Sequence, residues 1–202
     1  MHDSKANISE LLRIAEAAQR PSQEGIKVLR SRSDSMICRA ELSSGETIIL
    51  KLWNRPGARG LARRWSGTSS LKREFRALRH MTCVDPESPR PIAAFRMNRK
   101  RSAYTEGIAV SDLGECDCAA SVLKRILMQN IQARTLDFED KIIKVTNAML
   151  KGKFVDIDHR LINFVVTIDK DPVRIDFELC VKVLSLSLAP RMLGKMLGTL
   201  LG

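Results

Sequence analysis

Aromatic side chains and long apolar runs are both scarce in this chain of 202 residues. Phe, Trp and Tyr together make up 4% of the sequence. Modules that bind single-stranded nucleic acids usually stack the bases on exposed rings, so the composition argues against a nucleic acid as partner. A membrane-spanning helix needs about 20 consecutive apolar residues, and no run in the sequence approaches that length.

Cysteine pairs of the kind that build metal sites are also missing. The five cysteines are an odd number without a Cys-x-x-Cys pair, which is typical of reduced thiols in a cytoplasm. Cys116 and Cys118 with three scattered histidines do not supply the four ligands of a zinc site. The N-terminal MHDSKANISELLRI lacks the basic-then-apolar pattern of an export signal. We therefore expect a cytoplasmic protein.

Positive charge, in contrast, is abundant and unevenly spread. The formal net charge is +11, and residues 51–101 contain 14 Lys or Arg against three acids. Such a patch favours a polyanionic partner, for example a phosphorylated glycan or an anionic membrane surface. A solvated basic face without a partner would give the same count, so charge alone does not decide between them.

Hydrophobic periodicity predicts an α+β chain that begins with a helix. Apolar residues at helical spacing predict this first helix over about 8–20, ended by Pro21. Alternating apolar residues then predict two antiparallel hairpins, the first of them around the turn 43–46, with strands at 26–29, 36–42, 47–53, 92–97 and 103–108. Further helices are predicted at 69–81, 119–128, 138–150 and 190–201. The last helix either packs on the domain or lies on a membrane surface.

Two charged residues occupy positions that a core would normally exclude. Lys51 lies inside the apolar strand 47–53, and Glu74 lies on the apolar face of the helix 69–81, between Leu71 and Leu78. A half-buried lysine is costly without an opposite charge nearby. We therefore predict that Lys51 pairs with Glu74, the alternative being that Glu74 neutralises a neighbouring arginine.

The stretch from Phe154 to Glu178, FVDIDHRLINFVVTIDKDPVRIDFE, has a spacing typical of phosphoryl transfer. Asn163 follows Asp158 by five residues, and Asp176 follows Asn163 by thirteen. Phosphoryl transfer needs a carboxylate near the attacking hydroxyl and oxygen ligands for the magnesium that bridges the phosphates. Asn163 leads into the predicted strand FVVTI, and PVRIDF predicts the returning strand. An acidic loop beside an ordinary hairpin would show the same intervals.

Together these features resemble the protein-kinase-like superfamily, and most closely the lipopolysaccharide core kinase family (the Kdo/heptose kinases, WaaP-like). The resemblance runs from about residue 26 to residue 177, with IILKLW, LKREFRAL, YTEGI, DIDHRLINFVV and VRIDFE as its anchors. It implies a single two-lobed domain over residues 1–202. The N-lobe, about 22–108, would hold a small antiparallel sheet plus a helix. The C-lobe, about 109–202, would be mainly helical with a catalytic hairpin.

The resemblance also implies roles for individual residues. Lys51 would contact the ATP phosphates and Glu74 would brace it. Asp158 would be the base that orients the acceptor hydroxyl, while Asn163 and Asp176 would hold Mg²⁺ against the phosphates.

The connector between the lobes is expected at residues 105–108, from chain order alone. There the backbone groups of Glu106 and Ile108 would take the adenine edge of ATP.

Several positions depart from the family pattern. The residue two before the catalytic Asp is usually His and here is Asp156; a second carboxylate so close to Asp158 can raise the pKa of one of the two. Glu178 replaces the glycine that usually follows Asp-Phe, and the phosphate-covering loop RSRSDSMIC has no glycine. Only 24 residues follow Glu178, which favours a compact small-molecule or glycan kinase over a protein kinase.

The expected function is transfer of the ATP γ-phosphoryl group to a sugar hydroxyl of the lipopolysaccharide inner core, on Kdo or heptose. ATP and Mg²⁺ would be the cofactors. The acceptor would be an anionic glycolipid or sugar, met in peripheral contact with the inner face of the inner membrane. Two alternatives remain: a protein or small-molecule kinase of the same fold, and an inactive scaffold that binds ATP or a polyanion.

Overall fold

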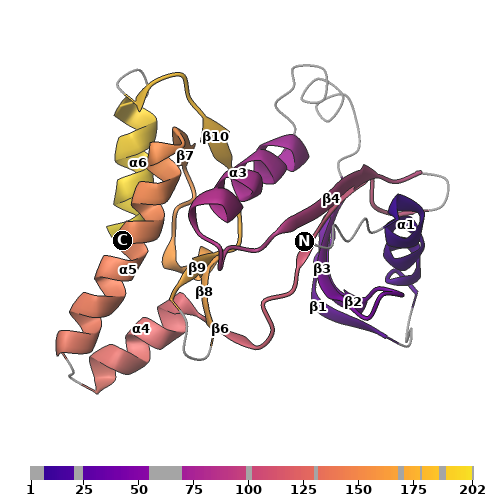
Figure 1. Ribbon diagram of the computed structural model, residues 1–202, viewed down its shortest axis with the longest axis horizontal. Coiled ribbons are helices and arrows are strands. Elements are labelled where there is room, and N and C mark those ends of the chain that lie inside the picture. Colours follow the sequence, from indigo (N-terminus) through magenta and orange to yellow (C-terminus); the bar gives the residue numbers. More distant parts are fainter. Residues whose placement is uncertain are drawn as a thin grey trace. The chain divides into compact units, whose positions relative to one another are not determined.

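The computed structural model (Figure 1) describes residues 7–20, 25–54, 70–98, 102–129, 132–167, 171–177, 179–186 and 190–201. Its chain divides into two compact units. The first comprises Met1–Phe75 with Arg90–Asp112, and the second comprises Arg76–Pro89 with Leu113–Gly202. The lobe boundary expected between residues 108 and 109 therefore falls inside the first unit, within a strand.

The first unit is built on a five-stranded antiparallel sheet in the order β1-β2-β3-β5-β4. The predicted small antiparallel sheet is confirmed. Gly45, at φ 82°, makes the left-handed turn of the predicted hairpin between the second and third strands. The strands are β1 (Ile26–Ser31), β2 (Ser35–Glu41), β3 (Thr47–Trp53), β4 (Pro91–Arg96) and β5 (Glu106–Ser111).

The predicted connector at residues 105–108 is wrong, because Glu106 and Ile108 lie inside β5. Ile108 is in register with Lys51 of β3 on one side and with Ala94 of β4 on the other. In a central strand the backbone N–H and C=O groups form hydrogen bonds with the neighbouring strands. They are therefore not available to hydrogen-bond adenine. The run from Glu106 to Val110 is buried throughout, as a central strand requires.

Helix α1 (Ile8–Ala17) covers one face of this sheet and closes its core. Asn7 caps the helix, with its side-chain oxygen accepting from the Ser9 N–H at 3.0 Å. The side chains of Leu11, Ile14 and Ala15 pack into one cluster with residues of the sheet, namely Cys38, Ala40, Ile48, Leu50, Leu52 and Phe95. Because side chains alternate along a strand, Lys51 points to the opposite face of β3.

Helix α3 (Ser70–Val84) corresponds to the helix predicted over 69–81. Its first residues, up to Phe75, belong to the first unit and the rest to the second. Three further helices belong to the second unit: α4 (Ala119–Met128), α5 (Gln132–Lys151) and α6 (Pro190–Leu201). The bounds of α4 and α6 agree with the prediction, whereas α5 begins six residues earlier than predicted.

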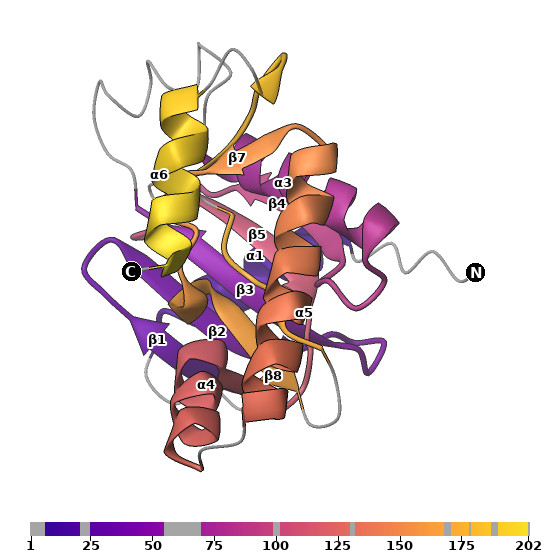
Figure 2. The ribbon, with the colours of Figure 1, turned by 90° about the vertical axis from the view of Figure 1, so that its left-hand side faces the viewer.

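Short strands link these helices. One sheet has the order β6-β8-β9 and a second pairs β10 with β7, and α5 and α6 both pack against β7 (Figure 2). The last helix therefore packs on its unit and buries Met196. The strands are β6 (Cys116–Cys118), β7 (Phe154–Asp156), β8 (Phe164–Thr167), β9 (Val173–Arg174) and β10 (Cys180–Lys182).

The predicted catalytic hairpin corresponds to β8 and β9, which pair antiparallel with Phe164 opposite Arg174. A single 3-10 turn, η1 (Leu161–Asn163), immediately precedes β8. Most of the turn between the two strands, residues 168–170, lies outside the described residues. Among the helices that the structure describes, none combines the length and the apolar character needed to cross a bilayer.

Candidate active site

The predicted pair of Lys51 and Glu74 is present in the first unit. Lys51 Nζ lies 2.7 Å from Glu74 Oε1. The two residues are 8% and 0% exposed, so the ion pair joins β3 to α3 in a poorly hydrated place. Each charge can be buried here because the other one neutralises it. Removing either partner would leave an uncompensated buried charge.

Asp158 and Asn163 are held together at the start of the hairpin. The Asn163 side-chain nitrogen donates to the Asp158 backbone oxygen at 2.8 Å and to its Oδ2 at 3.1 Å. Arg160 Nε lies 2.6 Å from Asp158 Oδ1. Partial burial acts to raise the pKa of Asp158, but the hydrogen bonds from Arg160 and Asn163 outweigh it and hold that pKa below its ordinary value. Asp158 is therefore an ionised carboxylate at neutral pH.

Three of the predicted site residues share one cavity in the second unit. Its volume is about 130 Å³, and its lining consists of Asp156, Asp158, Asn163, Arg174, Asp176 and Leu179. The segment that carries Asp176 is tied to the hairpin start because the Ile175 N–H donates to the Asn163 backbone oxygen at 3.0 Å. The interval pattern of the sequence thus corresponds to a real cluster of carboxylate and amide groups.

One of the residues that line this cavity is a buried arginine that sequence reasoning missed. Arg174 is 0% exposed, and its Nη2 lies 2.5 Å from Asp156 Oδ2. Asp156, the departure from the family pattern, is thus the counter-ion of Arg174. Its burial raises its pKa, and the Arg174 guanidinium opposes that shift. The neighbouring Asp158 carboxylate, expected from the sequence as the cause of a raised pKa, contributes less to that shift than burial does.

His159 extends this network toward α5. Arg174 Nη1 lies 3.0 Å from His159 Nδ1, and His159 Nε2 lies 2.8 Å from Thr146 Oγ1. An arginine only donates, so Nδ1 must be the unprotonated nitrogen and Nε2 must carry the hydrogen. The ring is therefore neutral, in agreement with burial and the nearby Arg174 charge lowering its pKa to about 3.

The sequence contained a signal for Arg174 and Asp156. Each is a charged residue inside an apolar strand, in FVDI and in PVRIDF, as Lys51 is inside IILKLW. The reasoning that paired Lys51 with Glu74 applies equally to these two residues. For His159 and Thr146 the sequence contains no comparable pattern.

The oxygen ligands expected for Mg²⁺ fit the chemistry of that ion. Asn163 and Asp176 line the same cavity, and Mg²⁺ prefers carboxylate and carbonyl oxygens with several waters and substrate phosphates. Within the described ranges, no group of three or more His, Cys, Asp or Glu side chains is arranged to hold a metal ion. If Mg²⁺ binds in this cavity, Asn163 and Asp176 would contribute protein ligands, and water and phosphate oxygens would complete its coordination.

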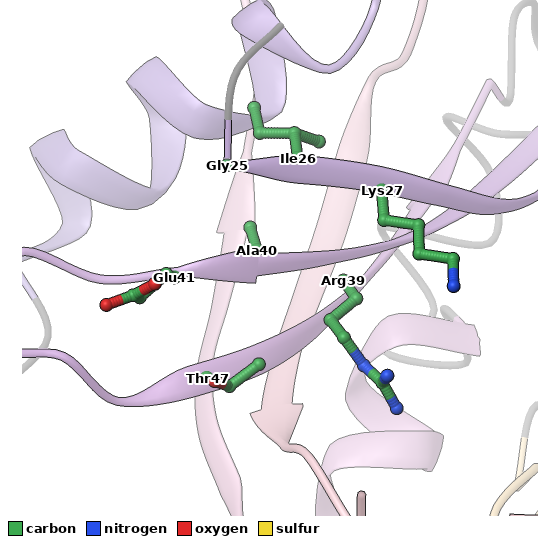
Figure 3. Close-up of a pocket in the computed structure, with 7 residues that line it drawn as sticks. All are labelled: Gly25, Ile26, Lys27, Arg39, Ala40, Glu41 and Thr47. Atoms are coloured by element: carbon green, nitrogen blue, oxygen red, sulfur yellow. The ribbon is translucent and has the colours of Figure 1, made fainter. Parts of the chain in front are cut away.

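A larger cavity lies in the first unit, beside the start of β1, the end of β2 and the start of β3 (Figure 3). Its volume is about 360 Å³, and its lining includes Lys27, Arg39, Glu41 and Thr47. Arg39 Nε is paired there with Asp112 Oδ2 at 2.7 Å. None of the predicted site residues lines this cavity, so we place the candidate active site at the smaller one.

The expected phosphate-covering loop is a short turn. β1 ends at Ser31 and β2 begins at Ser35, and the Arg32 N–H donates to the Ser35 backbone oxygen at 2.8 Å. Other features lie outside the described residues: Glu178, residues 55–69 and residues 99–101, which hold much of the basic segment.

Comparison with known proteins identifies the fold. No protein-family model and no curated protein matches the sequence. A solved structure described as WaaP in complex with acyl carrier protein aligns with 97% of this chain and 75% of its own, at a TM-score of 0.66 and 16% sequence identity. The chain thus has a mixed α/β fold similar to that of WaaP. At this identity the likeness establishes the fold alone.

Proposed function

We propose that this protein is an ATP-dependent kinase. The observation that carries the proposal is the convergence of Asp158, Asn163 and Asp176 on one cavity. A carboxylate for the acceptor and two oxygen ligands for a metal are the groups that phosphoryl transfer requires. The buried pair of Lys51 and Glu74 and the WaaP-like fold support the same interpretation.

Each residue has a separate task in this mechanism. Lys51, held by Glu74, would bind the ATP phosphates as a fixed positive charge. Asp158, ionised and oriented by Asn163, would accept the proton of the attacking hydroxyl. Asn163 and Asp176 would hold Mg²⁺, which neutralises charge on the phosphates when bound. Catalysis would come mainly from positioning and from electrostatic stabilisation.

For the acceptor we propose a sugar hydroxyl of the lipopolysaccharide inner core, on Kdo or heptose. This part rests on the resemblance to the lipopolysaccharide core kinases and on the likeness to WaaP. The net charge of +11 suits an anionic glycolipid at a membrane surface. A protein or small-molecule kinase of the same fold would differ only in the acceptor that becomes labelled.

Asp158→Asn tests the reaction. We expect it to lower kcat by about 100- to 10,000-fold, as loss of a general base does, with ATP affinity changed less than threefold. The measurement is transfer of ³²P from ATP to core glycolipid in the presence of Mg²⁺, with nucleotide binding followed separately by calorimetry. Equal transfer by the wild type and the variant would contradict the assignment.

Lys51→Met tests the nucleotide site. It removes the charge proposed to contact the phosphates, so we expect ATP to bind at least tenfold more weakly. Because Glu74 would be left buried without its partner, the double variant Lys51→Met with Glu74→Gln is the matched control. An unchanged ATP affinity in both variants would show that the pair is purely structural.

An inactive scaffold is the second candidate, and the short turn between β1 and β2 favours it. A turn without glycine brings less flexible backbone toward a nucleotide. A scaffold would bind ATP or a polyanion, transfer no phosphate to any acceptor, and show no difference between the wild type and Asp158→Asn.

A further inference from the structure

The Arg174 side chain is hydrogen-bonded to the backbone of two residues that line the cavity. Arg174 Nη2 donates to the Asp158 backbone oxygen at 3.1 Å, and Arg174 Nε donates to the Asp176 backbone oxygen at 2.9 Å. These two oxygens belong to the residues proposed as base and as metal ligand. The guanidinium therefore links the two segments through a side chain, in addition to the backbone bond from the Ile175 N–H to the Asn163 oxygen.

The guanidinium is also held by a carboxylate, a histidine ring nitrogen and two aromatic rings. Asp156 Oδ2 pairs with Nη2 at 2.5 Å and His159 Nδ1 lies 3.0 Å from Nη1. The rings of Phe164 and Phe177 have their centroids 5.2 and 5.6 Å from the Arg174 Cζ atom, within the range of cation–π attraction. A planar group fixed in this way has little freedom to move.

We propose that Arg174 is the positioning residue of this site, setting the Asp158 loop and the Asp176 segment at a fixed separation. Asp156 serves as its counter-ion and takes no part as an acid or base. Both Asp156 oxygens are used in this role, since Oδ1 accepts from the Asp158 N–H at 2.9 Å while Oδ2 binds Arg174. The kinetic consequence rests on the proposed kinase function, whereas the clamp itself does not.

The clamp requires an arginine in particular. A guanidinium presents five N–H donors in a rigid planar fork, whereas a lysine ammonium is a point charge on a flexible stem. A lysine at position 174 would keep the charge beside Asp156 but would not reach the Asp158 and Asp176 oxygens at the same time. Arg174→Lys therefore separates the ion pair from the clamp.

Kinetics provide the first test. For Arg174→Lys and Arg174→Met we expect kcat to fall about 100-fold, because a displacement of about 1 Å in a reacting group has an effect of that size. We expect the KM for ATP to change less than tenfold, since Lys51 and Glu74 are untouched. A kcat for Arg174→Lys within threefold of the wild type would overturn the proposal, because the ion pair alone would then suffice.

Hydrogen exchange of the full chain provides the second test and does not depend on activity. In both Arg174 variants we expect the amides of residues 157–163 and 175–177 to exchange at least tenfold faster, together. Met149→Ala is the control, since it opens the buried core of the same unit without removing any group that hydrogen-bonds Arg174. Acceleration spread over the unit as in Met149→Ala, or unchanged exchange, would overturn the proposal.

The two tests also separate this proposal from the proposed function. If the wild-type protein transfers no phosphate to any acceptor, the kinase assignment fails and the exchange experiment alone decides the clamp. If the wild type is active but both segments exchange normally in the Arg174 variants, the clamp fails and the kinase assignment stands.

Discussion

His159 is the residue whose protonation the buried network excludes. Its Nδ1 faces the Arg174 guanidinium, and its Nε2 faces Thr146, whose hydroxyl donates to the Ile142 backbone oxygen at 2.8 Å. A second ring proton would point at a positive charge inside the protein. Burial and Arg174 together lower the pKa of His159 to about 3, from an ordinary value of 6.5.

This lowered pKa predicts a loss of stability in mild acid. The unfolded chain takes up a proton at His159 below about pH 6.5, whereas the folded chain does not until about pH 3. Stability is therefore fully present above pH 6.5 and falls as the pH drops through this window. At pH 5 the contribution of His159 to the free energy of unfolding should be smaller by about 2 kcal/mol than at pH 7.

Urea unfolding of the wild type and of His159→Asn at pH 7 and pH 5 measures this loss. The asparagine keeps an acceptor toward Arg174 but does not titrate. The difference between the two proteins is the quantity to compare, because the raised pKa of Asp156 contributes a pH dependence of the opposite sign to both. Equal pH dependence in the two proteins would contradict the assignment of a neutral His159.

Among the elements, the end of α5 shows that a glycine next to a helix end can be required for space. The helix ends at Lys151, immediately before Gly152, where a glycine in the left-handed conformation would be common. The residue in the left-handed conformation, however, is Lys153, at φ 59°. Gly152 is needed for space, because a Cβ atom there would lie 2.2 Å from His80 Nε2.

Substitutions at these two neighbouring positions should therefore act in opposite directions. Lys153→Gly relieves a left-handed residue that costs about 1–2 kcal/mol, but it also raises the entropy of the unfolded chain. We expect a net gain of about 0.5 kcal/mol in the free energy of unfolding. Gly152→Ala should lower it by about 1–3 kcal/mol, because the new methyl group displaces His80. Chemical denaturation measures both, and a neutral Gly152→Ala would show that His80 moves freely.

At the scale of the whole molecule, the burial of apolar side chains stabilises the fold, and the excess of positive charge does not determine it. The likeness to WaaP covers 97% of the chain at 16% identity, so both units belong to the shared fold although few residues are identical. The core cluster of the first unit consists of apolar residues from α1 and the sheet. The net charge of +11 bears on partners and not on architecture.

Most elements could be predicted from local patterns. The alternation in β3 and the helical spacing in α4 and α6 determined these elements to within a residue. The failure at residues 103–108 has a tertiary cause. Glu106–Ser111 is a strand because it is covered by neighbours on both sides, and a buried run of this length does not show by itself where it begins.

The sequence by itself identified one pair of interior charges and the spacing of one cluster. Lys51 and Glu74 could be paired because each interrupts an apolar pattern, and the intervals from Asp158 to Asn163 and Asp176 are typical of phosphoryl transfer. Only the tertiary structure decided which partner the other buried charges have. Arg174 meets Asp156 and His159 because β9 packs beside the loop after β7. A periodic pattern specifies the face on which a side chain lies, whereas the group opposite it depends on how separate strands are packed together.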